Sequence, residues 1–341
     1  MAQTPNIDGV LVQWGDRLFY PGNRVVKVKP QPRLDGGGQR QRAAEIRQRI
    51  EATVVRRAPQ VMVKVTGGGR AMQAIAAHFR YISKNGRLDV ENEQGETIRG
   101  KSAVHDLADD WRLGGSLIDD IGYRREAFNI MLSMPRGTDP LIVQKAAREF
   151  AQTELADHKY VMVLHDHQAN PHVHISVRAV SRLGKRLNPR KNDLHRWRET
   201  FAEKLRGYGV EAEATRQTTR GQHRRPDPLW RLKAREEGRL RRAPSTKQSG
   251  PQNHPAKKAA VDAWVQIGLA LAKSGEAADR QLAGHVARFV KEMTATQAGL
   301  AVAPQRSPSP SEPTVQHPSQ SPGLQPNLQP KPPQRDIGPS R

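Results

Sequence analysis

The chain has 341 residues, no cysteine, and 56 lysines and arginines against 34 aspartates and glutamates, which gives a net charge of +22. The lack of cysteine excludes disulfides and thiolate metal sites, so a zinc-type site would need histidine, aspartate or glutamate ligands. We find no run of about 18 apolar residues and no signal peptide, and we expect a cytoplasmic protein. The positive charge favours a nucleic-acid partner over a basic protein without one.

Residues 1–58 form a mixed N-terminal extension, with a glycine-rich linker at 36–38 and then a basic, helix-like run. From residue 59 onward, apolar residues follow strand and helix periods in turn. Strands are predicted over 61–66, 127–134, 159–165 and 172–180, with a hairpin over 86–98. Helices are predicted over 70–83, 101–112, 139–155 and 192–209, the third of them capped by Asp139. Residues 59–222 should therefore form an α+β domain.

The character of the sequence changes after about residue 222. Residues 224–247 contain nine lysines and arginines against three acidic residues, and a helical pair is predicted between about 260 and 296. We treat 223–300 as a basic and helical region. Residues 301–341 hold eleven of the 25 prolines among serines and glutamines. This last segment cannot bury enough apolar surface to fold, and we expect it to be disordered.

Four of the twelve histidines lie within ten residues, HDHQANPHVH at 165–174. Because side chains alternate along a strand, His172 and His174 share one face with Ser176 and Arg178. A hairpin through 166–171 would bring His165 beside them. Three neutral imidazoles with open positions are typical of a catalytic metal site, although an exposed polar sheet face without a metal remains the alternative. His167 is a weaker candidate ligand or proton carrier.

A basic protein with a single-ion site suggests phosphodiester chemistry, which needs a nucleophile. Tyr81, one of five tyrosines, ends the predicted helix in AAHFRYISKNGRL. Its hydroxyl could attack a phosphate and form a covalent phosphotyrosyl bond. Local pattern alone equally fits a tyrosine that packs at a helix end.

Three segments together resemble a known family: VTGGGRAMQAIAAHFRYISKNGRL, FNIMLSMPRGT and KYVMVLHDHQANPHVHISVRAV. They are similar to the three motif regions of the conjugative relaxases, or mobilisation nucleases, of the T-DNA border endonuclease type. The similarity covers roughly residues 60–221.

This resemblance implies an HUH endonuclease with a central antiparallel sheet flanked by helices. It implies that Tyr81 nicks one strand at a transfer origin and stays linked to the DNA 5′ end. It also implies that His165, His172 and His174 hold a divalent metal, Mg²⁺ or Mn²⁺. The family commonly has aspartate where this chain has His167, so Asp166 or His167 would have to take over any role of that acid.

The resemblance further implies partners and a location. We expect single-stranded origin DNA, relaxosome accessory proteins and a type IV secretion coupling protein as partners, and translocation of the DNA-linked protein to a recipient cell. From the residues themselves, we expect the DNA contacts to come from a set of basic residues and glycines near the site, although the glycines equally fit a plain turn before the helix and the basic side chains equally fit solvated surface charges. The residues of this set are Arg80, Lys84, Arg87, Arg178, Gly67, Gly68 and Gly69.

Three other functions compete with this hypothesis. A rolling-circle replication initiator uses similar chemistry at a different origin. A non-catalytic DNA-binding accessory protein could keep the fold without the reaction. A metal hydrolase would cleave DNA with bound hydroxide and leave no covalent adduct.

Overall fold

A computed structural model of the chain describes residues 6–20, 36–221, 234, 237–239 and 254–301. The tail that we predict over 301–341 lies outside these residues except for its first residue, and most of the basic run 224–247 lies outside them as well. Among the described residues, we find no helix with the length and apolar character needed to cross a bilayer.

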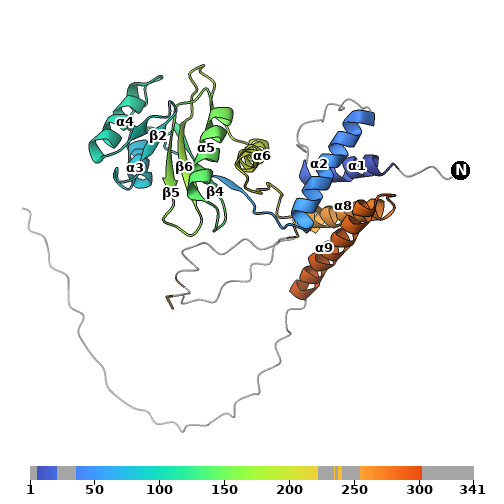
Figure 1. The fold of residues 1–341 in the computed structure, drawn as a ribbon. Coiled ribbons are helices and arrows are strands. Elements are labelled where there is room, and N and C mark those ends of the chain that lie inside the picture. The colour runs from blue at the N-terminus through green and yellow to red at the C-terminus, as the bar shows by residue number, and fades with distance from the viewer. Residues whose placement is uncertain (1–5, 21–35, 222–233, 235–236, 240–253, 302–341) are drawn as a thin grey trace, which may run out of the picture. The chain divides into compact units, whose positions relative to one another are not determined.

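A six-stranded sheet forms the centre of the domain predicted over residues 59–222, as Figure 1 shows. Its strands run in the order β1-β4-β6-β5-β2-β3, and each neighbouring pair is antiparallel. Their bounds are β1 Met62–Gly67, β2 Val90–Asn92, β3 Thr97–Ile98, β4 Ala127–Ser133, β5 Tyr160–His165 and β6 His172–Arg178. The predicted α+β fold with an antiparallel sheet flanked by helices is confirmed.

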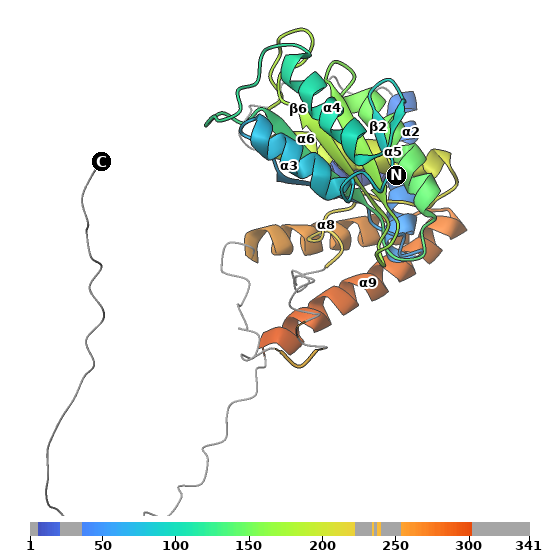
Figure 2. The ribbon, with the colours of Figure 1, turned by 90° about the vertical axis from the view of Figure 1, so that its left-hand side faces the viewer.

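Helices α3 (Met72–Ile82) and α4 (Lys101–Leu113) cover one face of the sheet and lie side by side (Figure 2). The apolar positions of α3 recur at helical spacing and are buried, as in Ile75 and Phe79. They pack with Trp111 of α4 against Val161 and Val163 of β5. This packing sets where the end of α3 meets the sheet.

Helices α5 (Pro140–Glu154) and α6 (Lys191–Gly207) cover the opposite face of the sheet (Figure 1). Asp139 caps α5 as predicted, because its carboxylate accepts a hydrogen bond from the Leu141 N–H. The side chains of β6 that alternate with the histidines, among them Val173 and Ile175, are fully buried against these helices. The period of two in this strand therefore separates an apolar core face from a histidine-bearing face.

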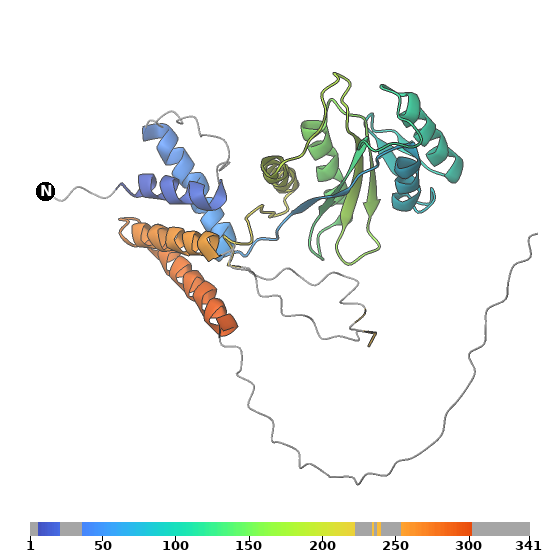
Figure 3. The ribbon, with the colours of Figure 1, turned by 180° about the vertical axis from the view of Figure 1, so that it is seen from behind.

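Four helices from the two ends of the described chain share a second apolar core (Figure 3). They are α1 Ile7–Phe19, α2 Gly36–Val54, α8 His254–Ala272 and α9 Ala277–Ala301. Trp264 of α8 is fully buried between Phe19 and Phe289. The basic, helix-like run predicted after residue 38 and the helical pair predicted between about 260 and 296 thus belong to one helical cluster with α1, which we call the terminal helix bundle.

The expected glycine-rich linker at 36–38 is wrong, because α2 begins at Gly36. The first N–H groups of a helix have no intrahelical partner in any sequence. Glycines in that first turn therefore destabilise the helix less than glycines in a helix interior do.

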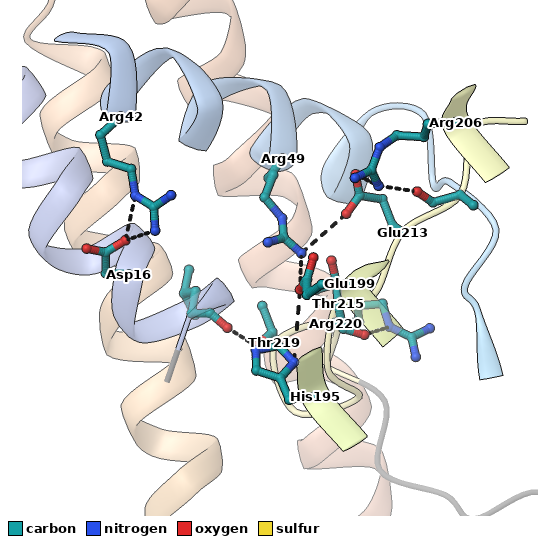
Figure 4. A network of polar contacts seen from close by, with 12 residues as sticks. Asp16, Arg42, Arg49, His195, Glu199, Arg206, Glu213, Thr215, Thr219 and Arg220 are labelled. Carbon is teal, nitrogen blue, oxygen red and sulfur yellow. Dashed lines mark hydrogen bonds and ion pairs between the residues drawn. The ribbon is translucent and has the colours of Figure 1, made fainter. Parts of the chain in front are cut away.

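Arg49 of α2 connects the bundle to the segment around α6, as Figure 4 shows. Its guanidinium lies 2.9 Å from Glu199 of α6 and 3.4 Å from Glu213. Only 9% of the arginine side chain is exposed. A buried cation of this kind needs its acidic partners, because an unpaired charge would be very costly to bury.

Candidate functional site

Three histidines converge on the α3 side of the sheet. His165 lies directly opposite His172 in the β5–β6 pairing, and His174 follows two residues later on the same face. The potential ligand nitrogens of the three rings all lie within 4.8 Å of one another. The hairpin that we predicted from residues 165–174 therefore brings the three imidazoles together, and we call them the histidine triad.

The hydrogen bonds of the triad match those of metal-ligating histidines. Nε2 of His165 lies 2.6 Å from the main-chain oxygen of Ile82, and Nδ1 of His172 lies 3.0 Å from that of Asn170. A metal-bound histidine commonly donates its other ring N–H to a carbonyl in this way. Each of these two rings therefore keeps its second nitrogen for a ligand.

His174 supports the same interpretation. Its Nδ1 is buried and has no hydrogen-bond partner among the described residues. Burial, with a further effect of His165 and His172, lowers the pKa of His174 to about 3. Burial also lowers the pKa of His165. These two rings are thus neutral at physiological pH, which is the form that binds a metal, and the residues of the triad fit a divalent cation.

Tyr81 lies in the last turn of α3 and is 71% exposed. Its ring stacks on that of His78 at a centroid distance of 6.2 Å and an interplanar angle of 28°. The His78 ring in turn meets His174 edge-on at 6.4 Å. His78 therefore lies between the candidate nucleophile and the triad, while the Tyr81 side chain stays open to solvent.

We did not predict His78 as a site residue from the sequence. The available signal was its spacing of three residues from Tyr81, which places both side chains on one helix face. That spacing also fits an ordinary pair of surface residues. Only the docking of α3 on the sheet shows that His78 belongs to the site. Burial lowers the pKa of His78 to about 4, and its Nε2 has no hydrogen-bond partner within the described part of the chain.

The turn after Tyr81 has an unusual backbone. Lys84, Asn85 and Gly86 follow one another with positive φ angles of 49°, 58° and 79°. The Asn85 N–H donates to the Arg80 carbonyl, and the Gly86 N–H donates to the Ser83 hydroxyl. This left-handed turn ends α3 directly after the tyrosine, so Tyr81 occupies a helix end with a defined geometry.

The other predicted site residues are distributed around this centre. Asp166 and His167 are exposed in the hairpin loop, and the His167 ring lies 5.2 Å from that of His165. Arg80, Lys84 and Arg87 are also exposed, and none of the three forms an ion pair with another described residue. Their charges are therefore available to an anionic ligand beside Tyr81.

Two of the three glycines before α3 have a structural explanation. A Cβ on Gly68 would lie 2.2 Å from the Ala127 carbonyl oxygen, and one on Gly69 would lie 2.4 Å from the Ile75 side chain. Gly67 pairs with Asn129 beside an irregularity of β1. Close packing accounts for Gly68 and Gly69 without any DNA contact.

Arg178 is placed differently from our expectation of a DNA contact. Only 3% of its surface is exposed, and its guanidinium donates to the carbonyls of Trp111, Gly114 and Ser116. These bonds use the charged group to hold the loop after α4. The expected DNA contact of Arg178 is therefore wrong, and we no longer include this residue among the proposed DNA-contacting residues. The strand alternation placed this residue on the correct face but did not show that a helix and loop cover its end of the strand.

Residues 81–210 match the family model described as "Relaxase: MobA/VirD2-like, nuclease domain". The match begins at Tyr81 and includes the whole histidine triad. This segment is similar to relaxase nuclease domains of the MobA/VirD2-like type.

Individual relatives of the relaxase domain agree with this assignment. The chain is 26% identical over 222 residues to the T-DNA border endonuclease VirD2 of Agrobacterium fabrum, covering 58% of this chain and 49% of that protein. It is 24% identical over 188 residues to the VirD2 proteins of Rhizobium radiobacter and Rhizobium rhizogenes. These matches cover 49% of this chain and 44% and 43% of the two relatives. The chain thus spans about half the length of the curated relatives that it matches.

Proposed function

We propose that this chain nicks one strand of a transfer-origin DNA at a specific site, for transfer of a conjugative plasmid or element. The observation that carries the proposal is the direct connection between the triad and the end of α3. His165 hydrogen-bonds the carbonyl of Ile82, the residue that follows Tyr81. An exposed phenol and a three-imidazole site are thus fixed to the same short stretch of backbone.

The proposed reaction is a transesterification. The Tyr81 hydroxyl oxygen attacks the scissile phosphorus, the bond from phosphorus to the 3′ oxygen breaks, and the tyrosine proton is given up as the 3′-OH takes one. The product is a phosphotyrosyl bond to the DNA 5′ end. Because the phosphodiester energy is kept in that bond, the reverse reaction can rejoin the strand after transfer.

His165, His172 and His174 would hold the divalent ion that the relaxase type implies. When bound, such an ion withdraws charge from the scissile phosphate and orients it. Mg²⁺ or Mn²⁺ is our proposal for the cell, although an all-imidazole set also accepts softer ions. His78 keeps the phenol ring in position by stacking, and Arg80, Lys84 and Arg87 contact the DNA backbone.

A covalent-adduct gel tests this function. The protein is incubated with single-stranded origin DNA and Mn²⁺ and then separated under denaturing conditions. We expect an EDTA-sensitive adduct with the natural chain, none with Tyr81→Phe or His172→Ala, and an undiminished adduct with Tyr208→Phe. Tyr208 is a suitable control because it lies at the end of α6, on the opposite face of the sheet.

The gel also separates the competing functions. Cleavage without an adduct would indicate a metal hydrolase, and binding without cleavage would indicate an accessory protein. An adduct on a replication origin but none on a transfer origin would indicate a rolling-circle initiator. Each of these results would overturn the proposal.

We propose relaxosome accessory proteins and a type IV secretion coupling protein as partners, and transfer of the DNA-linked chain to the recipient. The coupling protein would read the segment 301–341, nearly all of which lies outside the described residues. Removing that segment should abolish transfer while nicking stays normal. Unchanged transfer with normal nicking would rule the segment out as a signal.

A further inference from the structure

A cavity of about 880 Å³ lies between α3 and α4, beside the proposed nucleophile. Its volume is in the range of small-molecule sites. Arg80 lines it and directly precedes Tyr81 in α3. A strand that passes over Tyr81 therefore has this cavity within reach of its next nucleotides.

The cavity combines an apolar floor with a polar rim. Met72, Val104 and Ala108 are buried there, and Ala76 is half-buried. The rim carries exposed side chains with hydrogen-bonding groups, namely Gln73, Ser102 and His105. Such a site suits a flat ligand whose faces are apolar and whose edge is polar, which is the chemistry of a nucleobase.

The charges at the mouth of the cavity point to a ligand that carries phosphate. Arg112 is paired with Asp120 at 2.6 Å, whereas Asp109 has only His105 at 3.2 Å, a side chain that is charged only when protonated. Arg80 and Lys101, in contrast, form no ion pair with any residue that the structure describes. The two unpaired cations outnumber the single carboxylate of Asp109, and this net positive charge beside an apolar cavity favours a nucleotide over a neutral small molecule.

The loop after α4 exposes several large apolar side chains, one of which lines this cavity. Leu117, Ile121 and Tyr123 are 67%, 82% and 93% exposed, and Ile121 lines the cavity. The loop is nevertheless held in place, because the Asp119 carbonyl accepts a hydrogen bond from the Met72 N–H at the start of α3. An aromatic ring presented in this way can stack on an unpaired base.

We propose that the α3–α4 cavity holds one unstacked base of the same single strand that Tyr81 cleaves. Arg80 and Lys101 contact the phosphates on either side of that nucleotide, and Tyr123 stacks on a neighbouring base. The inference rests on the proposed function, since it assumes single-stranded DNA as the ligand. It adds a base-reading site that is separate from the histidine triad.

The test measures how much the bases contribute to DNA binding. Fluorescein-labelled oligonucleotides of about 15 nucleotides, one of thymidine and one fully abasic, are titrated into the unreactive Tyr81→Phe chain. We expect the thymidine strand to bind at least about tenfold more tightly than the abasic strand, from the stacking energy of one or two bases. Ala76→Leu, which fills the cavity, should remove most of this difference and leave the affinity for the abasic strand unchanged.

Ala278→Leu is the matched control, because it makes the same change at an exposed position of α9, outside the cavity. It should bind both strands as its parent does. If Ala76→Leu fails to fold, as judged by circular dichroism, Ser102→Leu at the exposed rim takes its place. Arg80→Gln should weaken binding to both strands equally.

An undiminished preference for the thymidine strand in the cavity-filling variants would overturn the proposal. So would a loss of preference in Ala278→Leu as large as that in Ala76→Leu. The covalent-adduct gel with the natural chain keeps this result distinct from the nicking function. If the natural chain forms the adduct but the cavity-filling variant still prefers the thymidine strand, only the cavity proposal is refuted. If the cavity-filling variant loses that preference but the natural chain forms no adduct, only the proposed reaction is refuted.

Discussion

Nε2 of His165 lies 2.6 Å from the main-chain oxygen of Ile82, so the triad is bonded to the backbone just beyond Tyr81. Two consequences follow from this contact. It fixes which nitrogen of His165 remains for a ligand, and it fixes the end of α3 against β5. A substitution in the triad should therefore shift the position of Tyr81, and a substitution at the end of α3 should shift the position of His165.

The first prediction concerns metal affinity. Titration calorimetry with MnCl₂ should give binding with the natural chain and a loss of at least about tenfold in affinity for His172→Gln, because a ligand is removed. His285→Gln, on α9 of the terminal helix bundle, should bind as the natural chain does. His167→Gln should keep most of the affinity, and a loss as large as that of His172→Gln would make His167 a fourth ligand.

The second prediction concerns the stacking of His78 on Tyr81. His78→Ala should slow adduct formation by about ten- to a hundredfold at saturating DNA, because a misplaced nucleophile reacts slowly. DNA affinity should change little. His78→Phe, which keeps a flat ring, should restore a large part of the rate. If both variants are equally slow, the imidazole nitrogens matter more than the ring, and the positioning role is wrong.

The third prediction concerns the left-handed turn after α3. A Cβ on Gly86 would lie 2.3 Å from the Gly100 carbonyl carbon, whereas one on Gly95 would have nothing within 4 Å. Both glycines have positive φ, at 79° and 84°, so alanine strains the backbone at either position. We expect urea unfolding to show that Gly86→Ala costs about 1–3 kcal/mol more than Gly95→Ala, as overpacking typically does. Equal costs would mean that the contact with Gly100 relaxes freely.

The fourth prediction concerns the ion pairs of Arg49 with Glu199 and Glu213. Arg49→Met leaves Glu199 without its arginine and Glu213 with only Arg206 at 3.8 Å, and both carboxylates are largely buried, so we expect a loss of about 3 kcal/mol in unfolding free energy. Arg56→Met is the control, because Arg56 and its partner Glu211 are 39% and 61% exposed. That exposed pair should contribute at most about 1 kcal/mol. Similar losses in both variants would argue against burial as the cause.

The fifth prediction concerns pH and His158, whose Nδ1 is bonded to the Arg178 carbonyl at 2.8 Å. Burial lowers the pKa of His158 in the folded chain, whereas the unfolded chain takes up the proton near pH 6.5. The unfolded state thus binds more protons as the pH falls, and the folded state loses stability below that pH.

His158→Gln should remove part of this acid sensitivity and keep a donor for the Arg178 carbonyl. Urea unfolding at about pH 7.5 and about pH 5.5 checks the sign. The natural chain should lose more stability between the two than the variant does, by at most about 1.4 kcal/mol per pH unit. A variant that is equally or more acid-sensitive would contradict the assignment.

Much of the fold and of the triad could be read from local patterns. The alternation of HVHISVRAV places His172 and His174 on one face of a strand, because neighbouring strand residues point to opposite sides. The short connection to His165 can only be a hairpin, which returns that residue to the same edge. These relationships span few residues, so the sequence by itself determined the triad.

Tertiary packing decided the rest, because it depends on contacts between residues far apart in the chain. The docking of α3 through Ile75 and Phe79 brings His78 between Tyr81 and His174. The loop after α4 covers the end of β6, so Arg178 binds carbonyls in place of phosphate. The helices at the two ends of the described chain share one core. The spacing of apolar residues within one helix or strand does not show these contacts, because in each case the residues that bury the side chain come from a distant segment of the chain.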